Sequence, residues 1–303
     1  MTATSAPARG GVRSPAGGAV RGARRRWRLP FSPWHLVLIP ATIVLIFPFV
    51  WLVITSVETP AEALHFPPVL IPHQIRLANY PDALNSAPFG RFFLNSAIVA
   101  VVTVLSNLVL CSLAGYAFAR FRFLGRTALF AVIMATLMVP FQVTMIPQFI
   151  ITKWLGVHVL AGVGINHIGA LILPNAATAF GIFFLRQFFR TLPLEYEESA
   201  RVDGASALQT FFHHTLPLLR PVLLVAVVLR TIDAVGTFDQ IFVLTKGGPG
   251  TATQLISIYA YNTAFLFNQY GRAMAMLIGV LAFLIVLMTA AVRLMRRASE
   301  KIE

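Results

Sequence analysis

The sequence predicts an all-α membrane protein whose chain crosses the bilayer six times. Hydrophobic residues make up 57% of the 303 residues and charged residues only 12%, about half of the ~25% found in soluble domains. So few charges cannot cover a water-exposed surface. Six stretches are apolar over roughly 20 residues, the length that a helix needs to cross a hydrocarbon core about 30 Å thick. Lysine and arginine also alternate between the loops as six spans require.

The six predicted spans, in chain order, are residues 34–57, 92–118, 127–151, 168–189, 217–238 and 273–294. The first is too long for the apolar region of a signal peptide, so we interpret it as an uncleaved signal-anchor. The second contains Asn95, Ser96 and Asn107, and small polar residues favour close helix contacts or a wet cavity. The third and fourth contain prolines, whose freed backbone carbonyls neighbouring helices can satisfy.

The basic residues give the orientation of the six spans. Eighteen of the 24 lysine and arginine residues fall in the N-terminal tail, the C-terminal tail and the loops after spans two and four. Basic residues collect on the cytoplasmic side, so both termini are predicted to be cytoplasmic. This distribution accounts for the net charge of +13 without any nucleic-acid partner. Residues 1–30 are rich in Pro, Gly, Ala and Arg, and we expect a disordered tail that contacts anionic lipid.

The loop between spans four and five, residues 192–217, is unusually acidic. Four of the eleven acidic residues of the chain lie in it: Glu195, Glu197, Glu198 and Asp203. Acids favour the first turn of a helix, and Gly204 suits the left-handed residue that ends one. Ser206 with Gln209 three residues later is a capping box that starts a second helix. The segment therefore predicts a short helix, a glycine turn and another short helix.

Two roles remain open for this short acidic helix, because so short a helix is marginal in water and must dock on something. It can pack against the ends of the protein's own spans. It can also project into a groove of a cytoplasmic partner, with its carboxylates paired to basic groups there.

The spacing around Gly204 carries a family resemblance. Glu198, Ser199 and Ala200, then three residues, Gly204, nine residues and His214-Thr-Leu-Pro217 resemble the EAA motif of ABC importer membrane subunits. The sequence departs from that pattern at Ser199, where Ala is usual, and at His214, where Ile is usual. Asn79-Tyr80, Asn95-Ser96 and residues 114–126 are similar to the carbohydrate-importing, maltose-permease-G-like branch.

The resemblance implies that residues 31–303 form a type I ABC importer permease domain in the bacterial cytoplasmic membrane. It implies four kinds of partner: a second homologous permease subunit, two ATPase subunits that bind ATP and Mg, an extracytoplasmic binding protein, and a sugar or oligosaccharide substrate. This chain would then have no catalytic residue and no cofactor of its own. The residues expected to couple it to the ATPases are Glu195, Glu197, Glu198, Ala200, Asp203, Gly204, Leu216 and Pro217.

Ionisable residues in span five are candidates for the translocation pathway, because intramembrane charge is usually functional. Arg230 and Asp233 share a helix face at a spacing of i, i+3, so they can neutralise each other, line the pathway, or do both. Asp239 lies near the membrane edge, where it can serve the pathway or cap a loop. The outer loops are expected at 58–91 and 240–271.

Within the second outer loop, Lys246, Gly247, Gly248 and Pro249 form either a simple turn or a contact for the binding protein. No metal site is expected, because His213 and His214 are adjacent and point about 100° apart on a helix. No phosphate-binding G-x-x-x-x-G-K-[ST] motif occurs. The alternatives are an ion-gradient-driven secondary transporter, an ABC importer subunit for glycerol-phosphate-type solutes, and a membrane interaction protein.

Overall fold

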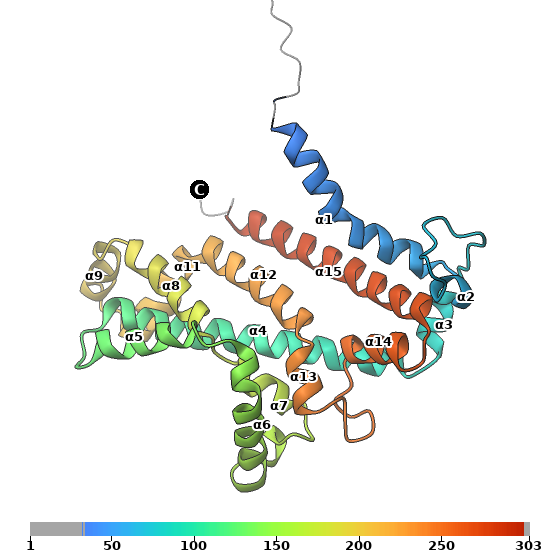
Figure 1. The fold of residues 1–303 in the computed structure, drawn as a ribbon. Coiled ribbons are helices and arrows are strands. Elements are labelled where there is room, and N and C mark those ends of the chain that lie inside the picture. Colours follow the sequence, from blue (N-terminus) through green and yellow to red (C-terminus); the bar gives the residue numbers. More distant parts are fainter. Residues whose placement is uncertain (1–31, 33, 300–303) are drawn as a thin grey trace, which may run out of the picture. The chain divides into compact units, whose positions relative to one another are not determined.

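The computed structural model describes residue 32 and residues 34–299 (Figure 1). The prediction for the 1–30 tail therefore lies outside the described residues. The chain divides into two compact units, Met1–Phe47 and Pro48–Glu303. All regular elements of the described residues are helices, as the fold class requires.

The longer helices are α1 (His35–Ser56), α4 (Phe89–Arg120), α5 (Arg126–Thr136), α6 (Phe141–His158), α8 (Ala179–Thr191), α12 (Arg220–Gly236), α14 (Ile256–Phe265) and α15 (Tyr270–Ser299). Shorter helices connect them: α2 (Pro60–Ala63), α3 (Asn79–Asn85), α7 (Gly169–Ile172), α9 (Glu195–Val202), α10 (Ala207–Gln209), α11 (Leu216–Leu218) and α13 (Asp239–Leu244). Two 3-10 turns, η1 (Ala161–Val163) and η2 (Leu173–Asn175), and one π-helical turn, η3 (Thr210–Thr215), complete the order.

Three described helices are long and apolar enough to cross a membrane by themselves: α1, α4 and the Tyr270–Ala290 part of α15. Two bent helix pairs meet the same test when each pair is taken as one span. Helix α12 has 17 residues, or about 26 Å at ~1.5 Å per residue, which is the lower end of what a span needs. The count of six spans remains a prediction.

Each of the third and fourth predicted spans corresponds to a bent pair of helices. The axes of α5 and α6 meet at 105°, and those of Gly169–Asn175 and α8 at 42°. Pro140, directly before α6, and Pro174, within η2, have no backbone N–H to continue a helical ladder. After the second break, Thr178 accepts a hydrogen bond from the backbone N–H of Gly181 at 3.1 Å and so caps α8.

Helix α4 is the element around which the second unit packs. It lies against α8 and also contacts α12 and α14, while α15 packs on α14, α3 and α12 (Figure 1). The face of α4 toward α8 is made of small and aromatic residues, including Cys111 and Tyr116. Side chains such as Val101 and Leu105 stay exposed and line a cavity of about 370 Å³ together with residues of α12 and α15.

The predicted outer loops contain helices that side-chain amides fasten to the spans. In the first, the Nδ2 amide of Asn79 donates to the carbonyl oxygens of Ser56 and Glu58, both at 2.9 Å. Glu62 accepts hydrogen bonds from the backbone N–H of His73 at 2.9 Å and of Thr59 at 3.2 Å. These bonds lower the pKa of the Glu62 carboxyl to about 2, because they favour its charged form.

In the second outer loop, residues of α4 hold the chain between Gly250 and α14. The Nδ2 amide of Asn95 donates to the carbonyl oxygens of Ala252 at 3.1 Å and Gln254 at 3.0 Å. The hydroxyl of Ser96 accepts from the backbone N–H of Ile256 at 3.0 Å. These contacts give Asn95 and Ser96 a structural role at the outer end of α4.

The close contact between α4 and α8 yields a prediction at Gly181. A Cβ atom there would lie 2.8 Å from Cys111 Sγ, 2.9 Å from Thr178 Oγ1 and 3.1 Å from Asn107 Oδ1. We expect Gly181→Ala to lower the free energy of unfolding by about 1–3 kcal/mol, the usual cost of overpacking. Thermal unfolding of the purified chain in detergent measures this.

Gly279→Ala is the matched control for Gly181→Ala, because a Cβ at Gly279 meets nothing within 4 Å. Adding Cys111→Ala to Gly181→Ala removes the nearest clashing atom and should restore part of the stability. Equal stability of the Gly181 and Gly279 variants would contradict the tight contact.

Candidate functional site

The acidic loop folds as the local sequence signals predict. Helix α9 begins at Glu195, so Glu195, Glu197 and Glu198 occupy its first turn. Gly204 follows with φ +86°, the left-handed conformation that favours glycine. The capping box is present with both of its bonds: Gln209 N donates to Ser206 Oγ at 3.3 Å and Ser206 N donates to Gln209 Oε1 at 2.8 Å.

One acid of α9, Glu197, is buried and paired inside the protein. Its Oε1 lies 2.9 Å from Arg120 Nε in the last turn of α4, and both side chains are less than a tenth exposed. Tyr116 OH donates to its other oxygen at 3.1 Å, and Thr215 Oγ1 donates to Oε1 at 3.4 Å. Arg120 Nη2 also donates to the carbonyl oxygen of Leu192 at 2.8 Å. The base of α9 is therefore tied to the end of α4.

The opposite face of α9 is exposed. Glu195, Glu198 and Asp203 lie on the surface, and the larger side chains beside them, Tyr196 and Val202, are 57% and 86% exposed. Ala200 is buried on the same side as Glu197, while Leu216 and Pro217 are half-buried where α11 leads into α12. The helix thus packs on its own protein through one face and offers carboxylates and apolar groups on the other.

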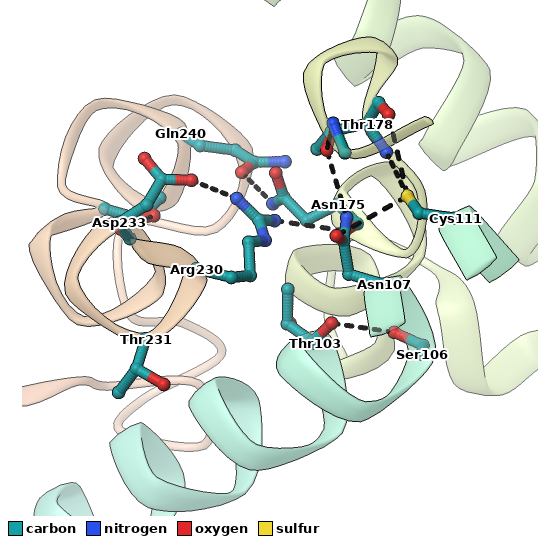
Figure 2. Close-up of polar contacts among 12 residues, drawn as sticks. Thr103, Ser106, Asn107, Cys111, Asn175, Thr178, Arg230, Thr231, Asp233 and Gln240 are labelled. Carbon is teal, nitrogen blue, oxygen red and sulfur yellow. Dashed lines mark hydrogen bonds and ion pairs between the residues drawn. The ribbon is translucent and has the colours of Figure 1, made fainter. Parts of the chain in front are cut away.

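A second polar cluster lies where η2, α12 and α13 meet (Figure 2). Arg230 pairs with Asp233 through its Nη1, and its Nη2 donates to the carbonyl oxygen of Asn175 at 3.0 Å. The Nδ2 amide of Asn175 donates to Gln240 Oε1 and, at 3.0 Å, to the carbonyl oxygen of Leu171. The charged side chain in α12 therefore satisfies a carbonyl that the break before α8 leaves free.

The polar residues of α4 reach the same break from the other side. Asn107 Nδ2 donates to Thr178 Oγ1 at 3.3 Å and to the carbonyl oxygen of Asn175 at 3.4 Å (Figure 2). Cys111 is fully buried, and its sulfur lies 3.5 Å from the backbone nitrogen of Thr178, which donates to it. Side chains of two helices thus converge on residues 175–178, where the fourth predicted span is interrupted.

Two cavities adjoin the cluster. The larger, about 380 Å³, lies between α4, α8 and α12, and Asn107, Thr178, Phe184, Arg230 and Asp233 contribute to its lining. The smaller, about 10 Å³, is near the lower limit for one water molecule. Three buried polar atoms without a hydrogen-bond partner belong to residues that line it: Thr103 Oγ1, Arg230 Nε and Gln240 Nε2.

The three ionisable candidates of the pathway separate in space. Arg230 and Asp233 lie together on the larger cavity, where the Arg230 side chain is 11% exposed and that of Asp233 is 66% exposed. Asp239 is exposed in the first turn of α13 and lies outside the lining of both cavities. Its position is that of an acid at a helix start, where the helix dipole favours it.

The outer turn at Lys246–Pro249 is built from its own backbone. Lys246 and Gly247 have φ angles of +49° and +86°, and Thr253 Oγ1 donates to the carbonyl oxygen of Gly248 at 2.6 Å. Lys246 and Pro249 are exposed, whereas Gly247 is buried. The turn therefore presents Lys246 and Pro249 on an ordered loop that Asn95 anchors. Among the described residues, no group of three or more His, Cys, Asp and Glu side chains could hold a metal ion.

The comparisons with known proteins agree with this architecture. Residues 107–301 match the family described as binding-protein-dependent transport system inner membrane component. The chain belongs to this family. It is 31% identical over 242 residues to the diacetylchitobiose uptake system permease protein NgcG of Streptomyces coelicolor, covering 76% of this chain and 78% of that protein. It is 32% identical over 265 residues to the lactose transport system permease protein LacG of Rhizobium radiobacter, covering 85% and 92%.

Solved structures show the same fold. A chain of a bacterial ABC transporter involved in the import of the acidic polysaccharide alginate matches with a TM-score of 0.64 and 21% identity, over 89% of this chain and 98% of that one. Family and fold together make this chain a multi-pass permease subunit of an ABC importer in the inner membrane.

Several residues that contact Glu197 or Arg230 were not predicted from the sequence. Tyr116, Arg120 and Thr215 are far from Glu197 in the chain, and Asn175 and Gln240 are far from Arg230. One signal was available for Glu197: Ala200 lies three residues later on the same helical face, and a small apolar residue there indicates a buried face.

The buried pair predicts opposite outcomes for neighbouring acids. Glu197→Ala leaves Arg120 buried without a carboxylate, and such a change costs about 3–5 kcal/mol of folding free energy. Glu198→Ala, on the exposed face, should change it by less than about 0.5 kcal/mol. Chemical or thermal unfolding of the purified chain measures both.

The double variant Arg120→Met with Glu197→Leu tests the cause of that loss. Replacing both ions with apolar groups removes the unpaired charge, so it should recover most of the stability lost in Glu197→Ala. No recovery would mean that the loss came from packing and not from the stranded charge.

Proposed function

We propose that this permease subunit imports a sugar or oligosaccharide by alternating access. The proposal rests on its relatives. Two of those above are named for diacetylchitobiose and lactose uptake, and a trehalose/maltose transport system permease protein MalF of Thermococcus litoralis is 32% identical over 275 residues. Membership of a binding-protein-dependent family favours ATP-driven import over transport driven by an ion gradient.

The two-faced helix α9 carries the mechanistic part of the proposal. Its exposed face, with Glu195, Glu198 and Asp203, has the shape and charge to enter a basic groove of an ATPase subunit. Its buried face is tied to α4 through Glu197 and Arg120. A force applied to the exposed face therefore acts directly on a membrane-crossing helix. This is the geometry required of a coupling helix, and Ala200, Gly204, Leu216 and Pro217 shape its base and exit.

The complex that this mechanism needs has three further kinds of component besides this subunit. A second, homologous permease subunit completes the pathway, two ATPase subunits bind ATP and Mg and drive closure, and an extracytoplasmic binding protein delivers the substrate. The exposed turn with Lys246 and Pro249, together with Gly247 and Gly248 that shape it, is the proposed contact for the binding protein. Rigid loops lose less conformational entropy on binding than flexible ones. An ordered turn anchored by Asn95 is therefore suited to binding a partner protein.

The larger cavity supplies the proposed pathway site. Asp233 offers an exposed carboxylate to it, and Phe180 and Phe184 line the same space as a stacked aromatic pair with ring centroids 5.9 Å apart. Carboxylates accept hydrogen bonds from hydroxyl groups, and aromatic faces suit the apolar faces of sugar rings. Arg230 holds Asp233 in place and is itself held by the Asn175 carbonyl.

A glycerol-phosphate-type solute is the alternative substrate. The sn-glycerol-3-phosphate transport system permease protein UgpE of Escherichia coli is 34% identical over 201 residues, covering 64% of this chain. Uptake assays of the reconstituted complex with labelled sugars and with glycerol 3-phosphate separate the two. Saturable, ATP-dependent uptake of the phosphate compound alone would replace the sugar assignment.

Charge reversal on α9 tests the coupling role. Glu198→Lys places a like charge against the proposed basic groove, so we expect ATP-dependent uptake and copurification of the ATPase subunits to fall by about tenfold or more, the effect of ~1.4 kcal/mol. The exposed position of Glu198 means that thermal stability should be unchanged.

Arg293→Glu is the control for that experiment. It reverses one exposed charge on α15, on the same predicted side of the membrane and outside the coupling loop. Normal ATPase copurification and uptake in Glu198→Lys would refute the coupling role of α9.

Neutralising carboxylates tests the pathway. Asp233→Asn should lower maximal uptake about tenfold while ATPase copurification stays normal, as expected for the loss of one charged hydrogen bond worth ~1.5 kcal/mol. Asp239→Asn, outside the cavity, should leave uptake unchanged. An unaltered rate in Asp233→Asn, or equal losses in both variants, would remove the cavity from the pathway.

A further inference from the structure

Four arginines that form no ion pair with a described carboxylate lie on the α4–α5 connection and on the last turns of α8. Arg122 and Arg126 come from the connection between α4 and α5, and Arg186 and Arg190 from the last turns of α8. Sequence placed all four on one side of the membrane but did not place them together. Helices α5 and α8 pack against each other, and the positive charges of Arg126 and Arg190 both repel that of Arg186.

Neutral groups hold two of these arginines in position. The guanidinium of Arg186 lies over the ring of Phe130, 3.9 Å from its centroid, and its Nε donates to the carbonyl oxygen of Phe118 at 3.3 Å. Arg126 Nη1 donates to the carbonyl oxygen of Phe121 at 3.0 Å. These contacts fix the guanidinium groups and leave their charges uncompensated.

Within the described part of the chain, none of these four arginines forms an ion pair. The carboxylate of Glu197 is taken by Arg120. Like charges held close together destabilise a fold. A positive-inside signal requires only that basic residues lie on one side, so orientation does not explain why they are brought together.

A bulky apolar tip lies beside the arginines. Phe121 is 46% exposed, Phe123 is 42% exposed and Leu124 is fully exposed. In the sequence they alternate with or adjoin Arg122 and Arg126. Large apolar side chains next to guanidinium groups are typical of segments at the boundary between headgroups and acyl chains, where the apolar groups insert and the cations stay at the phosphates.

We propose that Arg122, Arg126, Arg186 and Arg190 bind the headgroup of an anionic phospholipid, with Phe121, Phe123 and Leu124 inserted beside its acyl chains. The phosphate would accept hydrogen bonds from exposed Arg122 and Arg190 and neutralise the repulsion that Arg186 experiences from Arg126 and Arg190. Free phosphate can pair with the arginines only, whereas a phospholipid can pair with the arginines and also bury the exposed side chains of Phe121, Phe123 and Leu124. The inference rests on the membrane location of the chain; the proposed orientation decides only that the lipid lies in the cytoplasmic leaflet.

The site adjoins the coupling region. Phe121 directly follows Arg120, the partner of Glu197, and its ring lies 5.5 Å from that of Tyr116, which also contacts Glu197. A lipid bound at the α4–α5 connection would therefore order the chain next to the residues that hold α9. Lipid binding does not depend on what the subunit transports, so it can fail or succeed independently of the proposed function.

Native mass spectrometry of the complete importer tests the proposal. The complex is purified in neutral detergent and exposed to equimolar phosphatidylglycerol and phosphatidylcholine. The wild type should retain phosphatidylglycerol in preference. Arg126→Gln with Arg190→Gln should reduce that preference by about fivefold or more, since one basic residue near an anionic surface contributes ~1 kcal/mol. Leu124→Gln, which changes no charge, should also reduce retention.

Arg293→Gln controls for the loss of a basic residue elsewhere on the same predicted side and should retain lipid normally. Inorganic phosphate at the same concentration should not displace phosphatidylglycerol. Three outcomes would overturn the assignment. The double variant could keep the normal lipid preference, or inorganic phosphate could displace the lipid. The double variant could also lose the ATPase subunits and keep the lipid, which would make the cluster a protein contact.

Discussion

A helix that ends or breaks where the chain is buried leaves carbonyl groups that water cannot reach, and each such group needs a hydrogen-bond donor within the protein. In this permease the donors are polar side chains on neighbouring helices. Asn79 serves Ser56 and Glu58 after α1, and Asn95 serves Ala252 and Gln254 before α14. At the other end of α4, Arg120 serves Leu192 after α8.

The same constraint accounts for the intramembrane arginine. Arg230 reaches the carbonyl of Asn175 at the break before α8 and pairs with Asp233 on its own helix. A neutral side chain could serve the carbonyl, but a cation also fixes a carboxylate at the cavity. Arg230 thus has a structural role at the break and a proposed role in transport. If the fifth predicted span crosses the membrane, this charge lies there at considerable cost, stabilises the break and positions the carboxylate that the proposed pathway requires.

Local signals predicted much of this protein and failed where tertiary contacts decide. The fold class, the first and last spans, the Gly204 turn and the Ser206–Gln209 capping box depend on composition or on residues a few positions apart. The bends in the third and fourth predicted spans were not predicted, because hydropathy measures burial in lipid and does not register a 105° bend. The burial of Glu197 depends on Arg120, 77 positions away, and a charge pattern does not reveal which of three neighbouring acids turns inward.

Helix α4 gives these contacts a common mechanical basis. Asn95 anchors the outer loop, Asn107 reaches the break in the fourth predicted span, and Arg120 holds α9. The three positions are spread along one uninterrupted helix over about 38 Å at ~1.5 Å per residue. A helix of this kind transmits displacement along its length, whereas the bends at residues 137–140 and 176–178 are the places where neighbouring segments can change angle. On the proposed mechanism, movement of α9 therefore reaches the cavity and the outer loop together, because the same rigid element holds all three.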